Sequence, residues 1–149
     1  KQQTKINWIE NFKAKLKFLS ESSGWKFYQQ NYGDFRIYPS DNWGICFVYE
    51  YEKGLSIWKE GITIEQKEKI KEDLIGSISD FHFIDNEFHN NTTYVMAFNQ
   101  NQELMFKDED EFAWEANNTN LFDTIANILK PHLNEETRKM FLEINNKLE

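Results

Sequence analysis

The sequence has little cysteine, glycine or proline and no long hydrophobic run. Its single cysteine, Cys46, excludes an internal disulfide and a zinc site built from cysteines, and it favours a reducing compartment. Six glycines and two prolines exclude collagen-like and low-complexity chains. The longest apolar run, residues 45–49, is far too short to span a membrane, and no signal-peptide pattern opens the chain. We therefore expect a cytoplasmic protein that does not bind membranes.

Arginine is scarce as well, since Arg36 and Arg138 are the only arginines among 17 basic residues. With 25 acidic residues, the chain has a net charge of −8. Arginine is the side chain that best recognises phosphate and guanine through paired hydrogen bonds. We therefore do not expect this chain to bind nucleic acid directly. Its acidity suits a basic protein partner instead.

Aromatic residues, by contrast, are plentiful at 16% of the chain, and 40% of all residues are hydrophobic. A chain of this length with so much core material is expected to fold as a single domain over residues 1–149. It opens on Lys1 rather than on methionine. We expect either a trimmed start or the C-terminal fragment of a longer protein.

The spacing of apolar residues predicts an α+β fold. Segments that alternate apolar and polar residues between turns lie at 25–29, 35–38, 43–52, 55–60, 80–84 and 93–98, with an edge strand at 104–106. Helical patterns cover residues 4–21, the stretch after the capping box Thr63–Gln66, and two stretches capped by Asn120 and Asn134. Tight turns between the first strands imply antiparallel pairing. We expect a mostly antiparallel, curved sheet with helices packed against it, in the order α-ββββ-α-ββ(β)-α-α.

Asp41, Glu50 and Glu52 are the candidate catalytic residues. Nucleases of the PD-(D/E)XK type place one acid on a strand and an acid-x-lysine on the next, where the carboxylates can bind Mg²⁺. Here Glu52 occupies the position of the lysine, and Asp41 follows serine rather than proline. The alternative is a strand that ends with its acids in solvent. No other metal, nucleotide or nucleophile motif occurs, so we expect no metal and no cofactor.

Trp43, Tyr49, Tyr51 and Trp58 are the candidate binding residues. They belong to an aromatic set in the first four strands that is larger than one sheet face needs for its core. Either they form an exposed patch for a partner, or each is an ordinary core residue. The acidic run 108–111 is expected to be a solvated loop, with contact to a basic partner as the alternative.

A further pattern resembles part of a known family. It comprises Trp8 in the first helix, W-x-F at residues 25–27, the run Asn42–Glu50, and a hairpin that ends at Lys59–Ile62. This pattern resembles the C-terminal region of uncharacterised bacterial proteins of the PD-(D/E)XK nuclease superfamily. The resemblance implies that the chain lies downstream of a nuclease core, and that the family's catalytic acids and lysine lie outside it.

Three functions therefore remain open. The first is a noncatalytic accessory, recognition or assembly module of a bacterial nuclease-like protein. The second is a free-standing acidic immunity or inhibitor protein that binds a basic toxin. The third is a divergent metal-dependent nuclease. We expect the chain to have a protein partner and no catalytic activity by itself, while its oligomeric state is left open.

Overall fold

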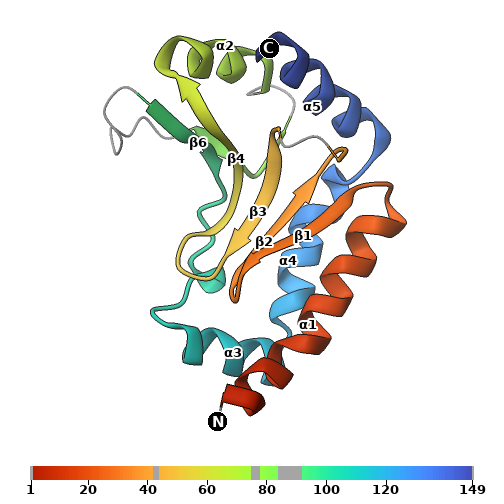
Figure 1. Cartoon of the computed structure of the whole chain (residues 1–149), viewed down its shortest axis with the longest axis vertical. Helices are drawn as coiled ribbons and strands as arrows, with labels where there is room; N and C mark the ends of the chain where they lie inside the picture. The colour runs from red at the N-terminus through yellow and green to blue at the C-terminus, as the bar shows by residue number, and fades with distance from the viewer. Residues whose placement is uncertain (1, 42–43, 75–77, 84–91, 149) are drawn as a thin grey trace.

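The computed structural model describes residues 2–41, 44–74, 78–83 and 92–148. It confirms the α+β fold, with one antiparallel sheet and a layer of helices against it (Figure 1). The six strands are β1 (Lys26–Asn31), β2 (Asp34–Tyr38), β3 (Cys46–Glu50), β4 (Gly54–Thr63), β5 (His82–Phe83) and β6 (Thr92–Phe98). Their order in the sheet is β1-β2-β3-β4-β6-β5. Strands that follow one another along the chain thus pair in the sheet, except β4 and β5, which are separated along the chain by α2 and in the sheet by β6.

The helices are α1 (Gln2–Ser22), α2 (Ile64–Leu74), α3 (Glu109–Asn118), α4 (Leu121–Leu129) and α5 (Glu135–Leu148). The capping box that opens α2 is reciprocal, because the Gln66 N–H donates to Thr63 Oγ1 at 3.0 Å and the Thr63 N–H donates to Gln66 Oε1 at 2.9 Å. Asn134 accepts from the Thr137 N–H at 2.8 Å. Asn120 precedes α4 as predicted but makes no side-chain capping bond.

Two short predictions were wrong. Residues 104–106 form no strand, because Leu104 is the buried last residue of a 3-10 turn, η1 (Gln102–Leu104), and the two residues after it have no regular secondary structure. The acidic run 108–111 is no loop, since Asp108 caps α3 and the three acids after it form the first turn. Carboxylates are favourable there because the amino end of a helix carries a partial positive charge.

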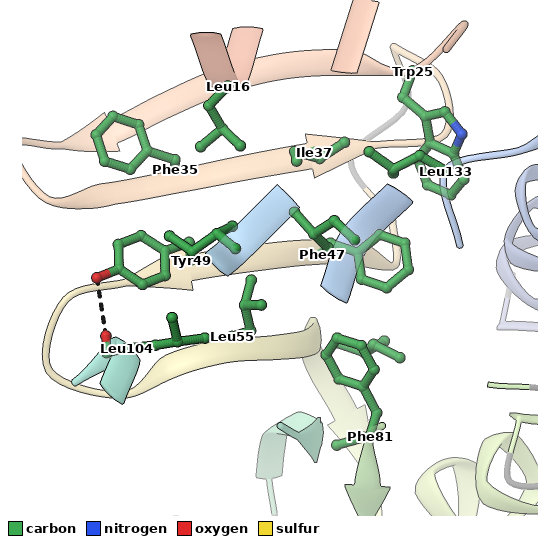
Figure 2. Close-up of a cluster of buried hydrophobic side chains, with 14 of the residues drawn as sticks. Leu16, Trp25, Phe35, Ile37, Phe47, Tyr49, Leu55, Phe81, Leu104 and Leu133 are labelled. Atoms are coloured by element: carbon green, nitrogen blue, oxygen red, sulfur yellow. Dashed lines mark hydrogen bonds between the residues drawn. The ribbon is translucent and has the colours of Figure 1, made fainter. Parts of the chain in front are cut away.

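The main core lies between the helices and one face of the sheet, which we call the inner face. Phe47 and Tyr49 point into it from β3, together with Leu16 of α1 (Figure 2). Phe112 of α3 belongs to the same core. The Tyr49 hydroxyl donates to the Leu104 carbonyl at 2.9 Å, which satisfies both groups inside the core. All five helices contribute residues to this core.

The opposite face of the sheet, the outer face, carries a separate small cluster of Tyr38, Cys46 and Val48, with Trp58 packed against it. Among the residues that the structure describes, no helical residue belongs to that cluster. The predicted alternation along β3 is therefore confirmed, because even-numbered residues face outward and odd-numbered residues face the core.

Candidate functional site

Strand register brings polar and aromatic side chains together on the outer face. Asp34 is paired with Glu50, Arg36 with Val48, and Ser56 with both Val48 and Phe98. These side chains surround a cavity of about 130 Å³, which we call the outer-face pocket. Its lining consists of Asp34, Arg36, Val48, Glu50, Lys53, Ser56, Trp58 and Phe98.

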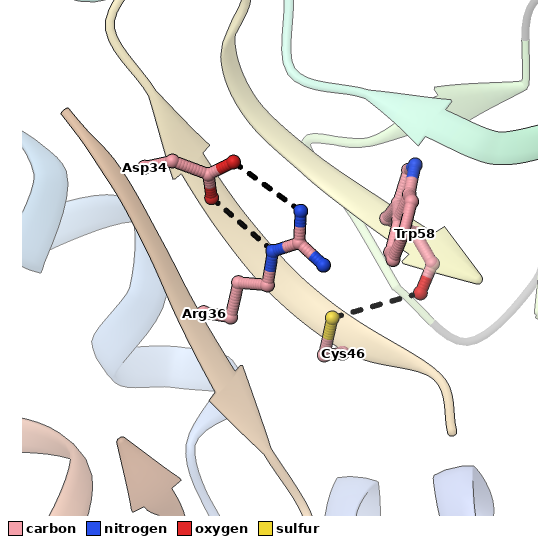
Figure 3. A network of polar contacts seen from close by, with 4 residues as sticks. All are labelled: Asp34, Arg36, Cys46 and Trp58. Carbon is pink, nitrogen blue, oxygen red and sulfur yellow. Dashed lines mark hydrogen bonds and ion pairs between the residues drawn. The ribbon is translucent and has the colours of Figure 1, made fainter. Parts of the chain in front are cut away.

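Arg36 lines this pocket and contacts two other lining residues, Asp34 and Trp58 (Figure 3). Its Nε and Nη2 donate to the two carboxylate oxygens of Asp34, each at 3.2 Å. The guanidinium carbon lies 4.3 Å from the centre of the Trp58 ring, a cation–π contact. Burial by itself would lower the pKa of Arg36, but its hydrogen bonds to Asp34 and Tyr38 outweigh this and raise it. Arg36 therefore stays charged, and its charge is compensated by Asp34.

Glu50 differs from Asp34 because part of its carboxylate lacks a partner. Its Oε2 atom is buried and accepts no hydrogen bond, so neither Arg36 nor Lys53 donates to it. Burial raises the pKa of Glu50, an effect that the positive charge of Lys53 opposes in part. A buried acceptor without a hydrogen-bond donor is unfavourable.

Cys46 lies on the same face but does not suit nucleophilic chemistry. Its side chain is fully buried, and Sγ contacts the Trp58 carbonyl oxygen at 3.7 Å. Burial raises the pKa of its thiol to about 12. Because only the thiolate is a good nucleophile, this thiol is inert at neutral pH.

A strongly acidic stretch, residues 103–111, which we call the acidic segment, lies at the β3–β4 end of the sheet, where Leu104 and Phe112 pack into the main core. It contains five acidic residues and one lysine, so its net charge is −4, which is half of the chain's net charge of −8. The segment is attached to the β3–β4 turn, because the Phe106 N–H donates to the Tyr51 carbonyl at 2.7 Å and the Tyr51 ring stacks on Phe112 at 5.9 Å. Partial burial and the carboxylates of Glu52 and Glu109 raise the pKa of Tyr51. Carboxylates from two segments far apart in sequence thus surround the β3–β4 turn.

The structure does not bring the three candidate catalytic acids together. Asp41 is exposed and precedes β3, whereas Glu50 ends it, so the length of the strand, ~13 Å, separates them. Glu50 and Glu52 do remain close, since the Glu52 backbone N–H donates to the Glu50 carboxylate. Across the described parts of the chain, no three histidine, cysteine or acidic residues are grouped so that they could hold a metal ion.

The four candidate aromatic residues do not form one exposed patch either. Tyr49 is only 2% exposed and belongs to the main core, and Tyr51 packs against that core. Trp58 lies on the outer face, on the other side of the sheet. Trp43 lies outside the described residues. The patch prediction was wrong for Tyr49 because inward and outward residues alternate along a strand, and the aromatic residues are divided between two faces.

Sequence reasoning missed Arg36, Asp34 and Phe98. The alternation within β2 could have placed Asp34 and Arg36 on one face, two residues apart. No pattern within a single segment could have shown that Glu50 and Trp58 lie beside them, because that depends on the register of three strands.

A second hollow, of about 600 Å³, lies between α1 and α4. It is mainly apolar, and it includes Phe18, whose side chain is 74% exposed. None of its lining residues has a buried polar atom without a partner. We therefore take the outer-face pocket as the candidate site.

Compared with protein-family models, curated proteins and solved structures, the chain matches none of them. Within the described residues, no helix combines the length and the apolar character that crossing a bilayer requires.

Proposed function

We propose that this chain is a noncatalytic recognition module that binds a basic protein partner. The observation that carries the proposal is the position of the outer-face pocket. It lies on the face of the sheet whose cluster holds no described helical residue, and the β3–β4 turn, which carries its lining residue Lys53, contacts a segment with half of the chain's net negative charge. In the setting that the sequence resemblance suggests, the module belongs to a bacterial nuclease-like protein and serves recognition or assembly.

The chemistry of this face supports a protein interface. Trp58 and Arg36 are residue types enriched in the cores of protein interfaces, and they already hold each other in position. Tyr28 extends the face on β1, where it is 41% exposed and paired with Arg36. An aromatic centre with acids at one end is complementary to a partner that carries lysines around an apolar contact.

The acidic segment also supports the second function, a free-standing inhibitor of a basic toxin. The two settings use the same surface and differ in whether the module is joined to a nuclease core. The metal-dependent nuclease is not proposed, because its three carboxylates are not grouped in the structure.

Titration of the ¹⁵N-labelled chain with hexalysine, and with hexaglutamate as the charge-reversed control, tests the proposal. We expect hexalysine to shift backbone amide signals of the outer face and the acidic segment, and hexaglutamate to shift none. The affinity should fall as salt is added, because exposed charges are screened within about 8 Å at physiological ionic strength. The absence of hexalysine binding at low salt, or shifts confined to other surfaces, would contradict the proposal.

A further inference from the structure

We infer that the hollow between α1 and α4, which we call the helical groove, binds an acidic amphipathic helix of a protein partner. The partner's apolar side chains lie against Phe18 and Phe122, and one of its carboxylates lies beside Lys130. The inference goes beyond the proposed function, because the groove belongs to the helical layer and includes no residue of the outer-face pocket. Three features of the groove lead to it: its apolar surface, its length and its local charge.

Phe18 supplies most of the exposed apolar surface of the groove. Its side chain is 74% exposed, which is the largest exposed fraction among the large hydrophobic residues that the structure describes. The residues one turn before and after it, Ala14 and Ser22, are small, so the ring protrudes beside open space. On the other wall, the Phe122 ring is held by the core, 6.4 Å from the ring of Phe12. Aromatic side chains of this kind are enriched in the cores of protein interfaces.

The length of the groove suits a helix. Ala14 and Ser22 are eight residues apart along α1, and Phe122 and Lys130 are eight residues apart on the other wall, so each wall is about 12 Å long. α1 and α4 lie side by side there (Figure 1), with the Lys15 ammonium nitrogen 5.8 Å from the centre of the Phe122 ring. A hollow of about 600 Å³ between two such walls accommodates about two turns of a third helix, whose apolar residues recur every three or four positions.

The charge of the groove differs in sign from that of the whole chain. Lys15 and Lys130 line it together with one acid, Asp123, so its net charge is +1, whereas the chain has a net charge of −8. All three side chains are exposed. Neither lysine forms an ion pair with an acid in the described parts of the chain. Both ammonium groups therefore remain available to carboxylates of a partner.

The placement of these charges selects where a carboxylate of the partner lies. Asp123 follows Phe122, which the Lys15 ammonium contacts, so this acid and this lysine share one end of the groove. Lys130 lies about 12 Å away, at the other end, where no acid lines the groove. At physiological salt, exposed charges are screened beyond about 8 Å, so the local lysine outweighs the distant acids of the chain.

The test uses NMR titration of the whole ¹⁵N-labelled chain with three peptides of about 12 residues, each held helical by a side-chain lactam bridge. The first carries leucines at one-turn spacing and glutamates on its other faces. The second has lysines in place of the glutamates, and the third has glutamines in place of the leucines.

We expect the first peptide to shift the backbone amide signals of α1 and α4 that belong to the groove. The second should bind the groove at least about threefold more weakly, because its charge is reversed, and the third should leave these signals unchanged. Equal binding of the first two peptides to the groove would overturn the inference, as would shifts by the first peptide that are confined to other surfaces.

Two pairs of matched variants separate the groove from the rest of the surface. Phe18→Ala removes the exposed ring from the groove, whereas Trp114→Ala removes a ring of α3 that is 50% exposed and does not line it. We expect Phe18→Ala to weaken binding of the first peptide at least about tenfold and Trp114→Ala to change it less than about twofold. Lys130→Gln should weaken it about threefold, and Lys139→Gln, at an exposed position of α5 outside the groove, should leave it unchanged. Equal effects within either pair would overturn the inference.

Sedimentation of the chain without peptide tests a second copy as the occupant. Two grooves that each have a net charge of +1 do not complement each other. We therefore expect wild type and Phe18→Ala to have the same sedimentation coefficient. If wild type sediments as a dimer and Phe18→Ala as a monomer, a second copy covers the groove and the assignment to an acidic partner helix is wrong.

Discussion

At the scale of single residues, burial on the outer face changes the chemistry of two side chains in β3. It raises the pKa of both the Glu50 carboxyl and the Cys46 thiol, because the charged form of each loses contact with water. The consequences differ. Glu50 lines a pocket and has one buried oxygen without a hydrogen-bond partner, whereas the Cys46 thiol is completely buried.

Cys46 should resist modification as long as the protein is folded. Its pKa of about 12 keeps it protonated, and its zero exposure keeps reagents away. With a disulfide reagent such as DTNB at neutral pH, we expect almost no release of thionitrobenzoate from the native chain and one equivalent in denaturant. The chain contains only this cysteine, so the signal has a single source. Rapid reaction of the native protein would contradict the burial of the thiol.

At the scale of elements, the start of β3 is anchored to α5 through one side chain. The Ile45 N–H donates to Asn145 Oδ1 at 2.8 Å, across 100 residues of sequence. The contact is possible because residue 44 is glycine, since a Cβ at that position would overlap the side-chain amide of Asn145. The sheet and the last helix thus approach each other closely at a point where no larger residue fits.

Gly44→Ala should therefore destabilise the protein by about 2 kcal/mol, through displacement of Asn145 and loss of its hydrogen bond. Asn145→Ala should cost about 1–2 kcal/mol, because the Ile45 N–H loses its acceptor. In the double variant the overlap disappears, so we expect the combined loss to be smaller than the sum by at least about 1 kcal/mol. Urea unfolding of all four proteins measures this coupling. Strict additivity would show that the two residues act separately.

At the scale of the whole molecule, His132 joins parts of the chain that are distant in sequence. Its ring lies 6.3 Å from Phe47 of β3 and 6.0 Å from Phe81, and its Nε2 is 3.9 Å from Asp80 Oδ2, too far for a hydrogen bond. Burial lowers the pKa of His132, although the negative charge of Asp80 opposes the effect. The folded state therefore disfavours the protonated ring.

Stability should accordingly depend on pH through this residue. Because its pKa is lower in the folded state than in the unfolded chain, the unfolded chain binds the proton first as the pH falls below about 6.5. The stabilisation present above that pH is then lost as the pH falls through the folded-state value. We compare the melting temperatures of His132→Phe and wild type at about pH 8 and pH 5. We expect wild type to lose roughly 3 °C more than the variant between these two pH values. Parallel melting curves for the two proteins would contradict this.

Local sequence determined much of the fold. Helical spacing, the capping box at Thr63–Gln66 and the alternation along β3 depend on neighbours within a few residues, and each was predicted correctly. The wrong predictions of secondary structure arose where the local sequence pattern was weak or was compatible with two structures. The acidic run 108–111 suits a loop or a helix start, and only the capping bond that Asp108 accepts from the Glu111 N–H and the packing of Phe112 decide between them.

The tertiary structure alone decided the candidate site. Composition determined that the chain is acidic, aromatic and poor in arginine, which favours a basic protein partner over nucleic acid. It could not determine that one of the two arginines would lie between Asp34 and Trp58, or that Glu50 would keep an oxygen without a partner. Both facts follow from the register of β2, β3 and β4, which is set by packing of the opposite face against the helices.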